Sequence, residues 1–233
     1  MRYLKPFALI ILGILLIAIT VKYLDGPAAT WSHEHLHRPQ VFNRFARYAD
    51  PLPVVAALCL AVVGLAAALG HWKSTSGGRT LIAACIAVLV GESIKEQLKF
   101  FFGRPWPEGW PSGNPTWIGT HSSAFQFFHG GTGWESFPSG HMAQIAAIAT
   151  VVWIRLPRAR WYGVALAVLV AFTLWYTNYH FVGDILAGAF LGIACGKGIV
   201  AIACAPRQYF VKPASGAPKA ASAASRPRLA EKR

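Results

Sequence analysis

The stretch TLIAACIAVLVGESIKEQLKFFF, residues Thr80–Phe102, joins a membrane-length apolar segment to four charged side chains near its end. About 20 mostly apolar residues in a helix cross the roughly 30 Å hydrocarbon layer of a bilayer. Glu92, Lys95, Glu96 and Lys99 all fall in the last third. Ionisable residues within a membrane helix are costly and usually functional. The stretch therefore predicts a spanning helix with a site at its end.

Five further apolar blocks flank this stretch, so the fold class predicted is all-α, a polytopic membrane protein with six transmembrane helices in a bundle. Of the 233 residues, 55% are hydrophobic and only 13% are charged, which excludes a disordered chain, a coiled coil and a disulfide-stapled mini-protein. The first block along the chain, residues 7–24, also resembles a signal peptide, but its length favours an uncleaved membrane anchor. The other five blocks are 7–24, 51–72, 139–156, 161–179 and 184–204.

The chain divides into a membrane domain, residues 1–206, and a flexible basic tail, residues 207–233, rich in Ala, Pro, Ser and Lys. The net charge of +13 comes from short connections and this tail, which indicates contact with anionic lipid headgroups rather than nucleic acid. Oligomeric state cannot be inferred. The polar, aromatic segment 25–50 is expected to lie along the membrane surface.

The distribution of cations predicts the orientation. The positive-inside rule puts both termini in the cytoplasm of a cell with an inner membrane, and puts the long Gly-, Pro- and Trp-rich loop 103–137 on the outer, periplasmic side. The polar ends of the last four spans face the same side. The cations assigned to the cytoplasmic side are Arg2, Lys5, Lys73, Arg79, Arg155, Arg158, Arg160 and those of the tail.

Three short clusters at this outer end carry chemistry. Lys95 and Lys99 share a helix face, and Arg104 follows where the span leaves the membrane, so cations converge there, although ion pairing that snorkels to the interface is the alternative. Ser139 and Gly140 open the next span, where a helix start can bind an anion, and His141 lies one step inside. Pro and Ser are also ordinary helix-start residues, and His141 could merely pack.

The third cluster is His180-Phe181-Val182-Gly183-Asp184. A carboxylate four residues after a histidine can accept its ring N–H, which fixes the tautomer and makes the other nitrogen a better nucleophile. A purely structural His–Asp pair is the alternative. No set of ligands is spaced for a metal, since only His33 and His37 of the histidines near residue 35 would share a helix face.

Taken together, these motifs resemble the type 2 phosphatidic acid phosphatase superfamily, which also includes the vanadium haloperoxidases. Its pattern is K-x6-R-P, then P-S-G-H, then S-R-x5-H-x3-D. Pro138-Ser139-Gly140-His141 and His180-x3-Asp184 match, within residues 80–200. Two positions depart from the pattern: seven residues after Lys99 stands Trp106, with Arg104 two residues early, and the third motif has Leu174 in place of its arginine.

The resemblance implies the role of each residue. His180 would attack phosphorus to form a phosphohistidine, Asp184 would orient it, and His141 would protonate the leaving oxygen and then activate water. Lys99, Arg104, Ser139 and the Gly140 amide would hold the phosphoryl oxygens, with no metal and no cofactor. Lys95, Asn178 and His129 are candidates to support the site in place of the missing arginine.

The function predicted is therefore an integral-membrane hydrolase acting on a lipid phosphate monoester or pyrophosphate through a phosphohistidine. Two alternatives stay open: a lipid phosphotransferase using the same intermediate, and a catalytically weakened protein that binds lipid phosphates. The headgroup of the lipid cannot be inferred.

Overall fold

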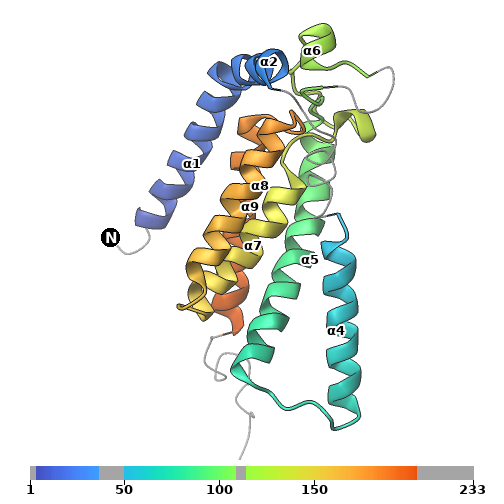
Figure 1. The fold of residues 1–233 in the computed structure, drawn as a ribbon, viewed down its shortest axis with the longest axis vertical. Coiled ribbons are helices and arrows are strands. Elements are labelled where there is room, and N and C mark those ends of the chain that lie inside the picture. Colours follow the sequence, from blue (N-terminus) through green and yellow to red (C-terminus); the bar gives the residue numbers. More distant parts are fainter. Residues whose placement is uncertain (1–3, 37–49, 109–113, 204–233) are drawn as a thin grey trace, which may run out of the picture. The chain divides into compact units, whose positions relative to one another are not determined.

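The computed structural model describes residues 4–36, 50–108 and 114–203, which are helical and contain no strand. The tail from residue 204 and His37 lie outside the described residues. Residues 1–203 and 204–233 are separate units. Figure 1 labels the helices: α1 Leu4–Tyr23, α2 Asp25–His35, α4 Leu52–Ala68, α5 Ser76–Phe102, α6 Trp117–Thr120, α7 Gly140–Arg155, α8 Arg160–Tyr176 and α9 Val182–Ala203.

Each of the six predicted spans contains a helix, but not all are long enough to cross a membrane. By length and composition, the described residues contain two membrane-crossing helices, α5 and α9, and a third if α1 and α2, bent by 52°, count as one broken span. The helices α4 and α8 are shorter apolar helices, and α7 has 16 residues. The helical membrane character is confirmed, whereas the number six stays a prediction.

Glycines on α9 set its close contact with α7. Gly188, Gly192 and Gly196 lie four residues apart, and a Cβ at Gly192 would fall 2.2 Å from the carbonyl oxygen of Ala143. Small residues at this spacing let membrane helices pack backbone to backbone. The contact extends to the helix starts, where the Ser139 amide donates to the Asp184 carbonyl at 3.0 Å. The two motifs that open α7 and α9 are therefore neighbours.

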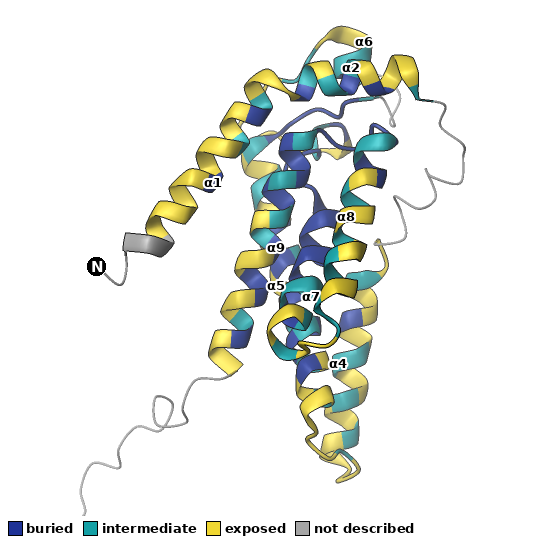
Figure 2. Cartoon of the chain, turned by 60° about the vertical axis from the view of Figure 1, so that its left-hand side comes forward, coloured by how far each residue is buried: buried dark blue, intermediate teal, exposed yellow. Residues whose placement is uncertain are grey.

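Large apolar side chains cover the outside of the bundle, while small ones fill the inside. Leu12 is 62% exposed and Val62 67%, whereas Ala87 and Ala147 are fully buried. Figure 2 shows this pattern as exposed outer faces around a narrow buried centre. Exposed apolar surface on this scale is what a protein surrounded by lipid tails presents, because lipid does not drive these side chains inward.

One end of the bundle is closed by loops and by α2. The helix α5 ends at Phe102. The next residue, Gly103, has a left-handed backbone (φ 51°) that turns the chain, and a Cβ there would meet the Gln126 carbonyl oxygen at 2.1 Å. The Trp117 indole N–H donates to Thr30 Oγ1 at 2.9 Å, joining the loop to α2. The segment expected along the membrane surface is thus a helix over residues 25–35 that packs on this loop, and 37–49 lies outside the described residues.

Candidate active site

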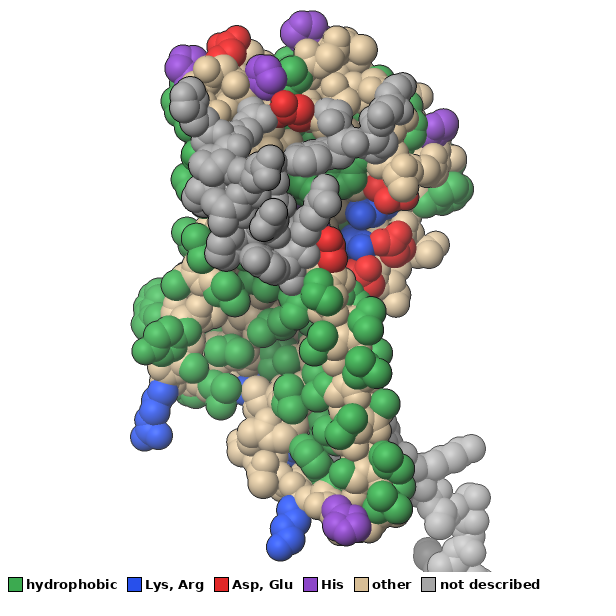
Figure 3. Space-filling model, turned by 45° about the vertical axis from the view of Figure 1, so that its right-hand side comes forward, with side chains coloured by type: hydrophobic (Ala, Val, Ile, Leu, Met, Phe, Trp, Pro, Cys, Tyr) green, Lys and Arg blue, Asp and Glu red, His purple; other side chains and the backbone are tan. Residues whose placement is uncertain are grey.

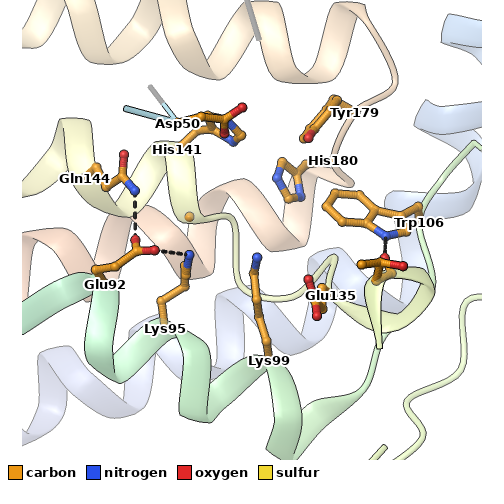
Figure 4. A pocket seen from close by; sticks show the side chains of 12 residues that line it. Asp50, Glu92, Lys95, Lys99, Trp106, Glu135, His141, Gln144, Tyr179 and His180 are labelled. Carbon is orange, nitrogen blue, oxygen red and sulfur yellow. Dashed lines mark hydrogen bonds and ion pairs between the residues drawn. The ribbon is translucent and has the colours of Figure 1, made fainter. Parts of the chain in front are cut away.

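A pocket of about 310 Å³ opens at the loop-covered end of the bundle. It lies between the last third of α5, the start of α7 and the turn between α8 and α9 (Figure 4). Figure 3 shows charged side chains gathered there, above the apolar surface of the helices. The lining residues are Asp50, Glu92, Lys95, Lys99, Trp106, Thr132, Glu135, Gly140, His141, Gln144, Tyr179 and His180.

Both predicted histidines face this pocket. His141 comes from the first turn of α7 and His180 from the turn before α9, and their ring centroids are 6.1 Å apart. Aromatic rings hold them in place: Trp106 lies 5.0 Å from the His180 ring, and Tyr179 packs edge-on against His141 at 5.4 Å. His180 is 2% exposed and His141 8%, so both rings sit in a largely water-excluded site.

Asp184 lies behind His180, on the side away from the pocket. Its Oδ2 is 3.7 Å from His180 Nδ1, which is too far for a hydrogen bond, and Nδ1 has no hydrogen-bond partner among the described residues. This leaves Nε2 as the nitrogen available to a ligand. The pKa of His180 is lowered to about 4, chiefly by burial and to a smaller extent by His141 and Lys99, against the opposing effect of Asp184. His180 is therefore neutral, as a nucleophile must be, through the physiological pH range.

Asp184 is held from several sides. Its Oδ1 accepts from Arg104 Nη1 at 2.5 Å, and its Oδ2 accepts from Ser136 Oγ at 2.6 Å and from the Phe181 amide at 3.1 Å. A fully buried carboxylate is tolerated only when it is paired and hydrogen-bonded in this way. The arrangement fixes where the carboxylate lies relative to His180.

Arg104, predicted to hold phosphoryl oxygens, is not among the residues that line the pocket. Its side chain is fully buried and does not line the pocket; besides Asp184, it bonds Asp25 Oδ2 through Nη2 at 2.8 Å. The Phe181 ring covers its guanidinium at 4.1 Å. The structure therefore shows Arg104 bound to two protein carboxylates, through one N–H of each terminal nitrogen.

Lysines are the cations that the described part of the pocket contains. Lys95 is 6% exposed and pairs with Glu92 at 2.7 Å and Glu96 at 2.6 Å. Lys99 points toward His180 (Figure 4) and forms no ion pair with the described residues. Gly140 lets Lys95 approach the start of α7, since a Cβ there would fall 2.6 Å from its Cδ.

Three other predicted site residues lie outside the pocket lining. Ser139 is fully buried and caps α7, accepting from the Met142 amide at 3.4 Å. Asn178 is 1% exposed and donates to the Ala29 carbonyl of α2 at 3.1 Å. His129 is exposed and packs against Trp134, with ring centroids 4.7 Å apart.

Sequence reasoning missed several residues that the structure brings to the site. Asp50 Oδ1 lies 2.8 Å from His141 Nε2, and Glu135 and Tyr179 line the pocket. Asp25, fully enclosed beside Arg104, was also missed, although an acidic residue directly after the first apolar block is a signal that could have pointed to it. In the described ranges, no group of three or more His, Cys, Asp or Glu residues is placed to hold a metal ion.

The profile of the PAP2 superfamily matches residues 80–207, more than half of the 233. The chain belongs to the PAP2 superfamily. A comparison with curated protein sequences returns no match.

Two solved structures are similar to this member of the superfamily. One is the transmembrane PAP2 type phosphatidylglycerolphosphate phosphatase from Bacillus subtilis, with 20% identity, a TM-score of 0.47 and coverage of 90% of this chain and 98% of that chain. The other is LpxE from Aquifex aeolicus, with 18% identity, a TM-score of 0.43 and coverage of 81% and 94%.

The structure accounts for both departures from the PAP2 pattern. Trp106, which stands where the first motif has arginine, lines the pocket and packs on His180. Leu174, which stands where the third motif has arginine, is fully buried in an apolar cluster with Met142 and Ile185. An arginine at position 174 would place its charge among these buried apolar side chains, where no described residue is positioned to pair with it.

Proposed function

We propose that the protein is an integral-membrane phosphatase that hydrolyses a lipid phosphate monoester or pyrophosphate through a phosphohistidine on His180. The observation that carries this proposal is the meeting of His141, His180 and Lys99 in one pocket, within the residues matched by the PAP2 superfamily. The pocket lies at the end of membrane-length helices, where lipid headgroups lie while their tails stay in the hydrocarbon layer.

In the first step, His180 Nε2 attacks phosphorus, so that an N–P bond forms as the bond from phosphorus to the leaving oxygen breaks. The leaving oxygen takes a proton from His141. Burial keeps His180 neutral before attack, and Asp184 behind Nδ1 favours the positive charge that the ring gains as it is phosphorylated. Asp50 Oδ1 lies 2.8 Å from His141 Nε2 and holds the orientation of this ring.

In the second step, His141 accepts a proton from a water molecule whose oxygen attacks phosphorus. The N–P bond breaks, inorganic phosphate leaves and His180 returns to its neutral form. The same histidine thus acts as acid and then as base, as microscopic reversibility requires.

The phosphoryl oxygens are held by Lys99, by Lys95 and by the backbone amides of Gly140 and His141 at the start of α7. A helix N-terminus offers unpaired N–H groups and the positive end of the helix dipole. Ser139 contributes by capping that helix, and Arg104 contributes by holding Asp184. These groups supply the charge stabilisation that a metal ion supplies in other phosphatases, so we propose metal-independent turnover.

We propose an inner-membrane location with the pocket on the outer, periplasmic side. Lys73, Arg79, Arg155 and Arg158 lie at or near the ends of helices opposite the pocket, which matches cytoplasmic connections under the positive-inside rule. The basic residues of the tail would then contact anionic headgroups of the inner leaflet.

The test is phosphate release by detergent-purified protein from a panel of lipid phosphates and a polyprenyl pyrophosphate, with and without a chelator. Release that survives the chelator and is absent from His180→Ala supports the proposal and names the substrate class. Transfer of a radiolabelled phosphoryl group to an added lipid alcohol, in preference to water, would indicate a phosphotransferase. Tight binding of the lipids without release would indicate a protein that only binds them.

The pH dependence provides a separate prediction. Because His180 attacks as the neutral ring, the fraction of protein able to attack is full above the pKa of His180 and falls as the pH drops through it. Burial places that pKa at about 4 rather than the ordinary 6.5. We therefore expect the acid limb of kcat/KM to lie near pH 4, measured in detergent on a monoester substrate. An acid limb centred near pH 6.5 would contradict a buried, neutral His180.

A further inference from the structure

Asp25 is a buried carboxylate that lies outside the residues matched by the PAP2 profile and contacts Arg104. We propose that Asp25, at the start of α2, is a positioning residue that holds Arg104 and, through it, Asp184 and His180. The inference rests on the proposed function, since it concerns the same nucleophile. It assigns a role in turnover to α2, which the match over residues 80–207 does not include.

Both oxygens of Asp25 are used. Oδ2 accepts from Arg104 Nη2 at 2.8 Å, and Oδ1 accepts from the Gly183 amide at 2.7 Å. The side chain is about 1% exposed. Gly183 is required for this approach, because a Cβ at that position would fall 2.7 Å from Asp25 Oδ2. Asp25 therefore bonds both the arginine and the backbone next to Asp184.

Arg104 connects the two carboxylates. Its Nη1 binds Asp184 and its Nη2 binds Asp25, so the plane of the guanidinium is set from two sides. The planar fork of arginine is suited to such paired contacts, and lysine cannot reproduce it. If Asp25 loses its charge, one side of the guanidinium is released. Asp184 Oδ1 then loses the fixed position of its arginine partner, while Ser136 and the Phe181 amide still hold Oδ2.

The charges have a second effect. Asp184 from α9, Lys99 from α5 and His141 from α7 face the His180 ring, and Arg104 and Asp25 lie behind Asp184. Asp25 and Asp184 together outweigh the single guanidinium by one negative charge. That charge favours the phosphorylated, positively charged ring over the neutral one, so losing it should weaken the transition state more than the ground state.

The position of α2 does not depend on Asp25 alone. Ser32 is fully buried, and its hydroxyl donates to the carbonyls of Trp175 and Tyr176 at 3.3 Å. Asn178 holds the Ala29 carbonyl at 3.1 Å. An isosteric change at Asp25 can therefore remove a charge while α2 stays anchored to the end of α8.

The experiment compares Asp25→Asn with Ser32→Ala as a matched control on the same helix and at similar burial. Asparagine keeps an oxygen for the Gly183 amide but presents an amide N–H to Arg104. We expect kcat to fall about 10- to 100-fold with KM changed less than about threefold, since a displaced nucleophile costs this much in rate. Vanadate, a transition-state mimic, should bind at least about tenfold more weakly, while inhibition by inorganic phosphate is little changed.

Ser32→Ala should lower the unfolding temperature and leave the ratio of vanadate to phosphate affinity unchanged. Asp25→Glu keeps the negative charge but places it one methylene further from the backbone, and we expect its kcat to lie between those of Asp25→Asn and the unmodified protein. This variant also provides the test if Asp25→Asn does not fold. Wild-type kcat in both Asp25 variants, or equal losses in Asp25→Asn and Ser32→Ala, would overturn the inference. Turnover that survives in His180→Ala would overturn the proposed function instead.

Discussion

Replacing His180 with alanine is expected to abolish phosphate release, with kcat at least about 10⁴-fold below that of the unmodified protein. The reason is that His180 Nε2 is the atom that bonds phosphorus in the proposed mechanism. Of the residues lining the described pocket, it alone combines a buried neutral ring, a carboxylate behind Nδ1 and Lys99 close by. Asp184→Asn should lose less of its kcat than His180→Ala, because the nucleophile remains and only its orientation and the stabilisation of its charge are weakened.

The measurement is rapid quench with a radiolabelled lipid phosphate, followed by detection of a base-stable, acid-labile phosphoprotein. The unmodified protein should form it, and His180→Ala should not. His141→Ala offers the matched control: it keeps the nucleophile, so an aryl phosphate with a good leaving group should still phosphorylate His180, and the phosphoprotein should then accumulate because water is not activated. Labelling that persists in His180→Ala would place the nucleophile elsewhere.

The groups proposed to react were predicted from local motifs. His141 and His180–Asp184 each open a helix, so their local geometry follows from a few neighbouring residues, and the structure brings both histidines to one pocket. The apolar blocks likewise predicted where helices lie. Helix length was less predictable: α7 and α8 end earlier than the apolar blocks suggest, because the blocks include the turns at their ends.

The surroundings of the reacting groups depend on contacts between residues far apart in sequence. Arg104 and Asp25 are separated by 79 residues, and nothing in the apolar pattern indicates that α2 bends back over the start of α9. Arg104 was predicted as a phosphate ligand because it is the arginine nearest the motif position that Trp106 occupies, whereas in the structure two carboxylate partners determine its position. Trp106 and Leu174 show the same point. Comparison with the motif reveals that an arginine is absent at each position, but it does not reveal which contacts the replacing side chain makes.

Arg104→Met and Lys99→Met are expected to fail in different ways. Removing the guanidinium leaves Asp25 and Asp184 buried without their shared cation, which should destabilise the fold by about 3–5 kcal/mol. Removing the Lys99 ammonium takes a cation from the pocket wall, where it forms no ion pair with the described residues, and should leave the fold intact. Activity should then fall about 10²- to 10³-fold, the loss expected for one charge-stabilising group.

Thermal unfolding in detergent, measured beside phosphate inhibition, separates the two roles. Lys99→Met should unfold near the temperature of the unmodified protein and bind inorganic phosphate more weakly. Arg104→Met should unfold at a clearly lower temperature, and Arg104→Lys should recover only part of this loss, because an ammonium group cannot bond both carboxylates in the fork geometry. An Arg104→Met protein of normal stability with weakened phosphate binding would instead make Arg104 the phosphate ligand that the motif pattern predicts. It would also mean that the guanidinium leaves its two carboxylates when substrate enters.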